Sequence, residues 1–182
     1  AAAPVPFVDH AAATRLLARC DALTDALLDG QAVAALAVRP APAGGEAWPL
    51  VPSGAVASAV VGLVGDDLVC VRGEGPGTAP RNHGSMPIAD RSTDGATVLV
   101  SGGDARALFA FARAEWQTLT AAALVGLGRT ALEIALAYVA ERHQFDRPIG
   151  AFQALQQQLA DLPIVIDGAA LLAAKAAWAG DR

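Results

Sequence analysis

Hydrophobic and polar residues follow two different patterns along this chain, one typical of helices and one typical of strands. In "DHAAATRLLARCDALTDALLDG" (residues 9–30) apolar residues stand three and four apart, which predicts one or two short helices, capped at Asp9 and stopped at Gly30. From residue 32 onward, short and partly β-branched runs are separated by Pro, Gly and Asp clusters, and such runs predict strands. These runs are "AVAALAV", "ASAVVGLV", "LVCV", "SMPIA" and "ATVLV".

Two turn signals connect the strand-like runs. The sequence Gly-Asp-Asp at residues 65–67 joins two of them. Asp94-Gly95 predicts a hairpin turn, because glycine tolerates the positive φ that such a turn requires. We therefore expect a small antiparallel sheet or a partial barrel.

The helical periodicity returns at Asp104, which is a candidate N-cap. It predicts either one helix over residues 104–142 or two helices joined near Arg113. Apolar residues cover more than one face of this segment, which predicts packing against several neighbours in a bundle. Residues 151–180 predict a second long helix, bent at Pro163. The expected fold is α+β and mostly α: short N-terminal helices, a small antiparallel β-domain and a long C-terminal helical hairpin of a bundle.

The composition excludes some classes of function. The chain has 182 residues, 54% of them hydrophobic, and a net charge of −5, with 13 basic residues interspersed among 18 acidic ones. This predicts a compact globular protein without the basic stripe that binds nucleic acid or an anionic membrane surface. The apolar stretch over residues 116–128 is too short to span a bilayer, so we expect no membrane span.

The cysteines and histidines give no sign of a metal site. Cys20 and Cys70 lie fifty residues apart, which favours two reduced thiols in a cytoplasmic protein over a disulfide framework. The three histidines have no metal-ligand spacing with one another. The first ten residues lack the charged start and apolar core of a signal peptide and also lack an initiator methionine, which suits a chain that begins partway through a longer protein.

The most specific stretch is "YVAERHQFDRPIGAFQALQQQLADL", residues 138–162. Arg142 ends the first long helix, where a cation complements the helix dipole. A guanidinium also offers a fixed fork of donors for a diphosphate, and Gln144, Arg147 and the amide-rich "FQALQQQ" would add charge and hydrogen-bond donors but no nucleophile. Both interpretations of Arg142, dipole complement and anion site, stay open on this reasoning.

This stretch, preceded by "GLGRTALEIALAY", resembles a segment of the acyl-CoA dehydrogenases. In that family a long helix ends in Arg-x-Gln-Phe-Gly-x-Pro-Ile and the next helix begins Phe-Gln-x-x-Gln-x-x-Leu-Ala-Asp. The resemblance is strong over residues 121–179 and weaker elsewhere. It implies three parts: a remnant of the N-terminal helical domain (1–31), the middle β-domain (32–101) and a partial C-terminal helical bundle (102–182).

In the family this helical hairpin lies at a subunit interface and reaches FAD that is held mainly by the neighbouring subunit. The resemblance therefore implies FAD, shared across an interface, with Arg142, Gln144, Phe145 and Gln153 as its contacts in this chain. The implied partners are an acyl-CoA substrate, another acyl-CoA dehydrogenase subunit in a homo- or hetero-oligomer, and an acceptor of the electron-transfer flavoprotein type.

The chain departs from the family pattern in three places. Asp146 stands where the family usually has glycine, which adds a negative charge near the expected diphosphate. Arg39-Pro40 stands where a Thr-Glu-Pro-like turn is expected, and the later Trp-Ile-Thr/Ser loop is missing. The chain stops at Arg182, before the family's glycine-rich flavin segment and the loop with its usual catalytic glutamate.

Some family members place the catalytic base near the start of the long helix, where Glu115 is the acidic candidate in this chain. A shift of one residue would turn its side chain by roughly 100° around the helix. A surface carboxylate is the more common role at such a position. The catalytic base therefore stays unassigned.

Three interpretations remain. The chain is an acyl-CoA dehydrogenase-like flavoprotein subunit of an oligomer that carries out α,β-dehydrogenation of an acyl-CoA thioester, in fatty acid or steroid degradation. Alternatively, it is a non-catalytic scaffold subunit that keeps the helical interface but binds no flavin. Or it is an ordered fragment of a complete enzyme. A half-bundle that ends at Arg182 would leave large apolar patches uncovered, which favours an oligomer.

Overall fold

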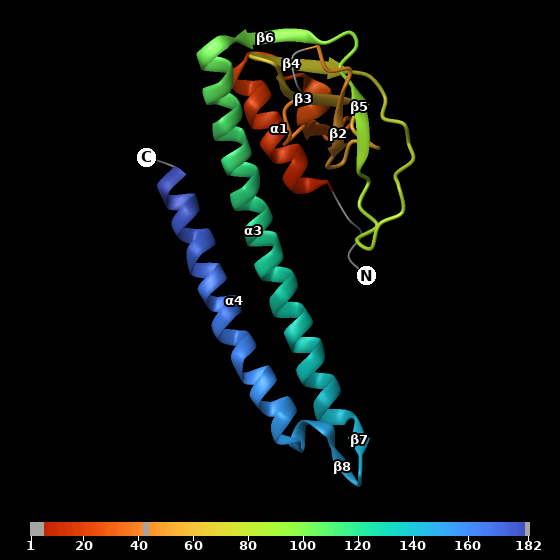
Figure 1. Cartoon of the computed structure of the whole chain (residues 1–182), viewed down its shortest axis with the longest axis vertical. Helices are drawn as coiled ribbons and strands as arrows, with labels where there is room; N and C mark the ends of the chain where they lie inside the picture. Colours follow the sequence, from red (N-terminus) through yellow and green to blue (C-terminus); the bar gives the residue numbers. More distant parts are fainter. Residues whose placement is uncertain (1–5, 42–43, 181–182) are drawn as a thin grey trace. The chain divides into compact units, whose positions relative to one another are not determined.

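The computed structural model describes residues 6–41 and 44–180 (Figure 1). The chain divides into two compact units, Ala1–Trp116 and Gln117–Arg182, and α3 (Gly102–Glu141) belongs partly to each. The expected α+β class with a majority of helix among its regular elements is confirmed. The division into three family-like parts stays a prediction.

The first unit begins with two short helices, as expected: α1 (Phe7–Arg19) and α2 (Asp25–Leu28). The expected cap at Asp9 is wrong, because α1 begins at Phe7 after Pro6 and Asp9 lies inside its first turn. Asp9 is buried rather than exposed at the helix end.

Four strands form the main sheet, in the order β1-β3-β4-β6. Their bounds are Ala34–Leu36, Ala59–Val64, Asp67–Arg72 and Thr97–Ser101. The tight turn between β3 and β4 is confirmed, with Gly65 at a φ of 59°. The sheet is mixed: β3 pairs antiparallel with β4, and β4 with β6, as expected, whereas β1 and β3 run parallel, because the long connection between them carries the chain back to the same end.

The intervening connection contains β2 (Ala47–Val51), which pairs with β5 (Ala89–Ser92) in a separate two-stranded sheet. The expected hairpin at Asp94-Gly95 is therefore wrong. Gly95 does turn the chain, at a φ of 70°, but the strands on its two sides belong to different sheets. The run "SMPIA" contributes only Ala89 to a strand, and β2 was not predicted because Pro49 interrupts its pattern.

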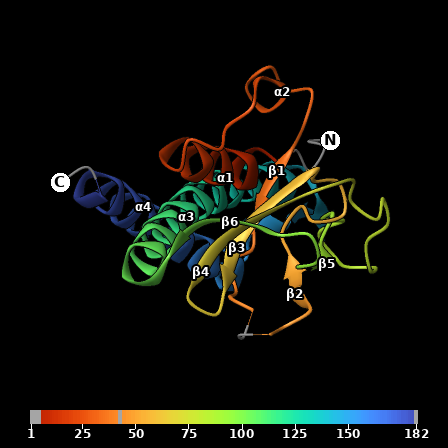
Figure 2. The same cartoon turned by 90° about the horizontal axis from the view of Figure 1, so that it is seen from above.

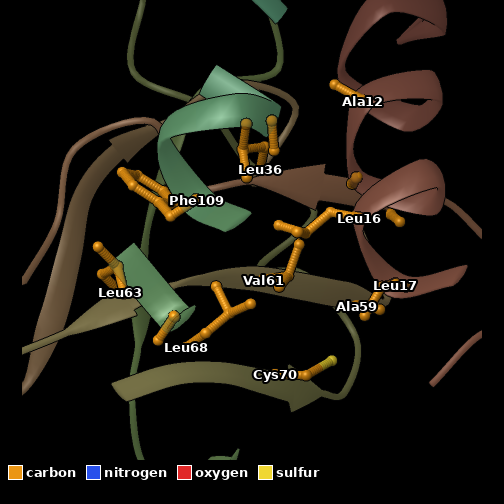
Figure 3. Close-up of a cluster of buried hydrophobic side chains, with 14 of the residues drawn as sticks. Ala12, Leu16, Leu17, Leu36, Ala59, Val61, Leu63, Leu68, Cys70 and Phe109 are labelled. Carbon is orange, nitrogen blue, oxygen red and sulfur yellow. The ribbon is translucent and has the colours of Figure 1, made fainter. Parts of the chain in front are cut away.

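The main sheet is buried on both faces. α1 and the first turns of α3 lie along one face of the sheet (Figure 2). Alternate strand residues pack against them in a cluster that includes Leu16, Leu36, Val61, Leu68 and Phe109 (Figure 3). The remaining strand residues face Trp48 of β2, whose indole N–H donates to the Leu63 carbonyl over 2.9 Å. This three-layer packing explains why β3 reads as a continuous apolar run rather than an alternating one.

The second unit is a helical hairpin. α3 is one unbroken helix that begins at Gly102, so Asp104 lies in its first turn rather than at the cap, and no break occurs near Arg113. α4 (Gln153–Gly180) follows, with Pro163 inside it. An ion pair of 3.2 Å between Arg129 and Asp167 joins the two helices.

Both α3 and α4 are long and apolar enough to cross a membrane, judged by length and composition. The expectation of no membrane span rested on residues 116–128, a stretch much shorter than the 40-residue helix that contains it. Helices in the bundle of a soluble protein meet the same criteria. The absence of a membrane span therefore stays a prediction.

Candidate functional site

The link between α3 and α4 is a small β-hairpin that the sequence did not predict. β7 (His143–Gln144) and β8 (Arg147–Pro148) pair antiparallel, which leaves Phe145 and Asp146 as the two turn residues. Both have positive φ, 53° and 61°. Type I′ turns require this geometry and usually contain Asn-Gly, so Phe-Asp at these positions carries no signal for the turn.

The conformation of Asp146 explains the family preference for glycine at this position. A left-handed backbone costs roughly 1–2 kcal/mol for most residues and nothing comparable for glycine. Aspartate tolerates it better than most side chains. The turn is therefore retained in this chain, with an added carboxylate.

Phe145 stands at the tip of the hairpin with 86% of its surface exposed. Its ring lies edge-to-face with that of Phe152, at a centroid distance of 6.2 Å. The Arg147 guanidinium lies 4.3 Å from the centroid of the same Phe152 ring. Phe152 thus supports both side chains, a role that the sequence reasoning missed although Phe152 stands in the quoted Phe-Gln motif.

The backbone of Arg142 is fixed on both sides. Its N–H donates to the Tyr138 carbonyl over 2.9 Å, and its carbonyl accepts from the Ile149 N–H over 2.7 Å. The side chain is exposed, and within residues 6–41 and 44–180 it has no ion-pair partner. A fixed backbone with an unpaired guanidinium suits the binding of an external anion.

The two expected glutamines follow this arginine in the sequence. The Gln144 side-chain amide donates to the His143 carbonyl over 2.9 Å. Gln153 is the first residue of α4 and is exposed. The structure thus places all four expected FAD contacts, Arg142, Gln144, Phe145 and Gln153, within one exposed segment of the second unit; their role as contacts stays a prediction.

The donor set of this segment fits a dinucleotide such as FAD. A guanidinium fork matches a diphosphate, side-chain amides match polar ring edges, and an exposed aromatic ring can stack. Asp146 is the one carboxylate in the described hairpin, and its negative charge would oppose the binding of a diphosphate.

Glu115 lies in the first unit and already has a partner. Its carboxylate is 2.6 Å from the Arg15 guanidinium, and only 14% of its side chain is exposed. The ion pair joins α3 to α1. Its assignment as a catalytic base stays a prediction.

The cysteines show no reactive environment. Both are free thiols, and burial raises the pKa of each, with Asp21 adding to the effect at Cys20. Among the described residues, no group of three or more His, Cys, Asp or Glu side chains is placed to hold a metal ion.

Comparison with known proteins agrees with the hairpin motif. A model of the acyl-CoA dehydrogenase C-terminal domain matches residues 107–182. YngJ of Bacillus subtilis, named "Probable acyl-CoA dehydrogenase", is 49% identical over 62 residues, which cover 34% of this chain and 16% of that protein. Benzylmalonyl-CoA dehydrogenase of Aromatoleum aromaticum is 43% identical over 68 residues, which cover 37% and 18%.

Solved structures match nearly the whole chain. The steroid acyl-CoA dehydrogenase Tcur3481-Tcur3483, in its G363A variant, has a TM-score of 0.75 at 25% identity, covering 98% of this chain and 57% of that one. The ChsE4-ChsE5 complex from Mycobacterium tuberculosis has a TM-score of 0.71 at 25% identity, covering 97% and 56%.

These matches agree on the acyl-CoA dehydrogenases, a family of FAD-dependent oxidoreductases, and residues 107–182 match the C-terminal domain of that family. The chain spans less than a fifth of the length of the two curated relatives and little more than half of the two solved chains.

Proposed function

We propose that this chain is an acyl-CoA dehydrogenase-like flavoprotein subunit whose assembled oligomer carries out α,β-dehydrogenation of an acyl-CoA thioester. The observation that carries the proposal is the exposed hairpin segment, where the backbone of Arg142 is fixed and its guanidinium has no ion-pair partner among the residues that the structure describes. This segment is also where the sequence motif of the family is strongest.

Each residue of the segment has a distinct role in the proposal. Arg142 binds the diphosphate of FAD through its guanidinium, while Gln144 and Gln153 donate to polar edges of the cofactor. Phe145 packs against an apolar ring. FAD itself, when bound, supplies the two-electron oxidation of the thioester.

Removal of the α-proton requires a base within reach of the α-carbon. Glu115 is the candidate in this chain, but its carboxylate is ion-paired with Arg15. We leave the base unassigned in the proposal.

The proposed assembly is a hetero- or homo-oligomer with an acyl-CoA dehydrogenase subunit. Two solved neighbours carry the names of two components, Tcur3481-Tcur3483 and ChsE4-ChsE5, and the first is called a steroid enzyme. Exposed large apolar side chains on α3 and α4 support burial against a partner; they include Leu127, Ile134, Ile164, Leu171 and Leu172. An electron-transfer flavoprotein-type acceptor, a role in fatty acid or steroid degradation and a cytoplasmic location complete the proposal.

The alternative is a non-catalytic scaffold subunit that keeps the helical interface and binds no flavin. The observation that favours it is Asp146, because its carboxylate lies at the turn next to the proposed diphosphate contacts. The charge would weaken binding of an anionic cofactor.

The visible absorption spectrum of the purified chain, alone and co-expressed with its genomic neighbour, tests the proposal. We expect the bands of oxidised flavin in the co-expressed complex. Flavin with the chain alone would support a self-associating dehydrogenase. No flavin in either sample would favour the scaffold.

A further inference from the structure

Two consecutive residues in the first turn of α1 attach this helix to three other segments. Asp9 is buried and accepts the Ser53 hydroxyl through Oδ2 and the Trp116 indole N–H through Oδ1, the latter over 2.7 Å. His10 accepts the backbone N–H of Ala34, the first residue of β1, through Nδ1 over 3.0 Å. α1 therefore lies beside β1 (Figure 2) and is attached there through a titratable side chain.

The Ala34 amide has no other acceptor within the main sheet. β1 is an edge strand and pairs with β3 alone among the strands that the structure describes. The Ala37 N–H donates to the Val61 carbonyl of β3 over 2.9 Å, and because successive amides of a strand point in opposite directions, the Ala34 N–H points to the free edge. Ala34 is completely buried, so water does not reach its amide. Without His10 this N–H would be a buried donor that lacks an acceptor, which is unfavourable.

The hydrogen bond requires a neutral imidazole. Because Nδ1 is the acceptor, the single ring proton of neutral His10 is on Nε2. Protonation places a second N–H on Nδ1, where it faces the Ala34 N–H, so two donors oppose each other. Histidine is the side chain that ordinarily changes its charge between pH 5 and 8, so this hydrogen bond is sensitive to mild acid.

The strands packed against α1 offer no charge to a protonated ring. Ala34–Leu36 and Ala59–Val64 contain no titratable residue. In the part of the chain that the structure describes, no carboxylate forms an ion pair with His10. The carboxylates of the adjoining helices are Asp9, which is bonded to two neutral donors, Glu115, which is paired with Arg15, and Asp25 and Asp29, which are exposed on α2.

We propose that His10 is a pH-sensitive switch between α1 and β1. The neutral ring holds the first turn of α1 on the free edge of β1, and the protonated ring releases that turn. The hydrogen bond is present above the range in which histidine titrates and is lost as the pH falls through this range. Release also withdraws Asp9 from Ser53 and Trp116, because Asp9 precedes His10 in the same turn. The switch does not depend on the proposed function, since it uses neither a cofactor nor a partner.

Amide hydrogen exchange of the full chain at about pH 7.5 and about pH 5.5 tests the switch. Protection factors remove the intrinsic effect of pH on exchange, and they are compared for Ala34 and for Val69, a buried residue of β4. We expect the protection factor of Ala34 to fall by about tenfold or more at the lower pH, while that of Val69 changes by less than about twofold. Equal protection of Ala34 at the two pH values would overturn the proposal.

The variant His10→Gln distinguishes titration of the ring from other effects of acid. A glutamine side chain can accept the Ala34 N–H through its carbonyl oxygen and does not titrate, so Ala34 should be protected equally at both pH values. The matched control is His83→Gln, at an exposed loop histidine, which should keep the pH dependence of the wild type. A fall in Ala34 protection in His10→Gln as large as in the wild type would assign the effect to another group and overturn the proposal.

Nuclear magnetic resonance of the wild-type chain decides the question if His10→Gln does not fold. At the higher pH we expect Nδ1 of His10 to give the signal of an unprotonated ring nitrogen. At the lower pH the indole N–H signal of Trp116 should shift, because its acceptor Asp9 moves with the first turn of α1. The signal of Trp48 should stay, because Trp48 donates to the Leu63 carbonyl instead. A proton on Nδ1 at the higher pH, or an unchanged Trp116 signal at the lower pH, would contradict the switch.

Discussion

Glu115 of α3 and Arg15 of α1 form an ion pair with a nitrogen-to-oxygen distance of 2.6 Å. The arginine is 60% exposed and the glutamate 14%. One helical turn earlier on α3, Phe111 receives the Arg19 guanidinium at 4.1 Å from its ring centroid. These contacts give Glu115 a structural role at the position where the sequence suggested a base.

The variant Glu115→Gln therefore distinguishes a structural role of Glu115 from a role as the catalytic base. We expect turnover of the assembled protein to stay within about twofold of wild type, because the carboxylate is already committed to Arg15. The loss of stability should be below about 1 kcal/mol, since solvent screens the exposed arginine. Turnover and urea unfolding are measured together, with Arg15→Gln as the partner control. A loss of turnover in Glu115→Gln alone would assign Glu115 as the base.

Arg142→Ala tests the proposed diphosphate contact. Loss of a charge-assisted hydrogen bond should weaken FAD binding by about tenfold to a hundredfold. Arg142→Lys should recover part of the affinity, because an ammonium keeps the charge but not the fork. The measurement is flavin retained per complex, with Arg129→Ala as control on the same helix. Equal flavin content in Arg142→Ala and wild type would remove Arg142 from the site.

Asp146→Gly should stabilise the hairpin turn. Glycine adopts the φ of 61° without the steric penalty, which we expect to outweigh its extra unfolded-state entropy by up to about 1 kcal/mol. Asp146→Ala removes the same charge but keeps the strain, so it should be less stable than Asp146→Gly. Thermal unfolding followed by circular dichroism compares them. Identical Tm values for the two variants would show that backbone strain at this turn is negligible.

Much of the first unit was predictable because buried strands appear in the sequence as short apolar runs. The apolar runs that became β1, β3, β4 and β6 were all recognised, and so was the Gly65 turn. β2 was not predicted because it contains a proline and a bulge. The misread turn at Gly95 has a different cause: turn chemistry identifies a reversal, but it does not say which strands pair across it.

The candidate site was predictable to the extent that side-chain type reveals chemistry. Arg142 and the glutamines stood out as donors, and the structure brings them into one segment. Phe152 was missed because its part is to support Phe145 and Arg147, and a supporting ring leaves no charge or spacing signal in the sequence. Asp9 was misread as a cap for a similar reason, since its partners Ser53 and Trp116 are distant in sequence.

The two thiols should differ in accessibility, and both should react slowly at neutral pH. Burial raises the pKa of Cys70 and of Cys20 above the ordinary value, so the thiolate fraction at a given pH is lower than in an unfolded chain. With a disulfide reagent at pH 8 we expect Cys20 to react first, because Cys70 is buried. The reaction rates of both thiols should still rise with pH at values above the ordinary pKa of a thiol. Rapid reaction of both thiols in the folded protein, as in urea, would contradict this.

Arg91 carries the largest expected effect on stability. It is buried in β5, and its guanidinium donates to three backbone carbonyls: Gly54 at 2.9 Å, Ala57 at 2.5 Å and Gly73 at 3.0 Å. Burial lowers its pKa, and nearby Glu74 partly offsets this effect. A guanidinium is not deprotonated in proteins, so the group is charged at neutral pH. These hydrogen bonds hold the connection after β2 next to the end of β4.

Arg91→Met should destabilise the first unit by about 3 kcal/mol or more, because it leaves up to three carbonyls without a donor in a poorly solvated site. Arg81→Met, at an exposed position, should change the free energy of unfolding by less than about 0.5 kcal/mol. Urea titration of both variants gives the comparison. A small loss in Arg91→Met would mean that water replaces the guanidinium at these carbonyls, and the connection after β2 would then be held mainly by Ser53 and Asp9.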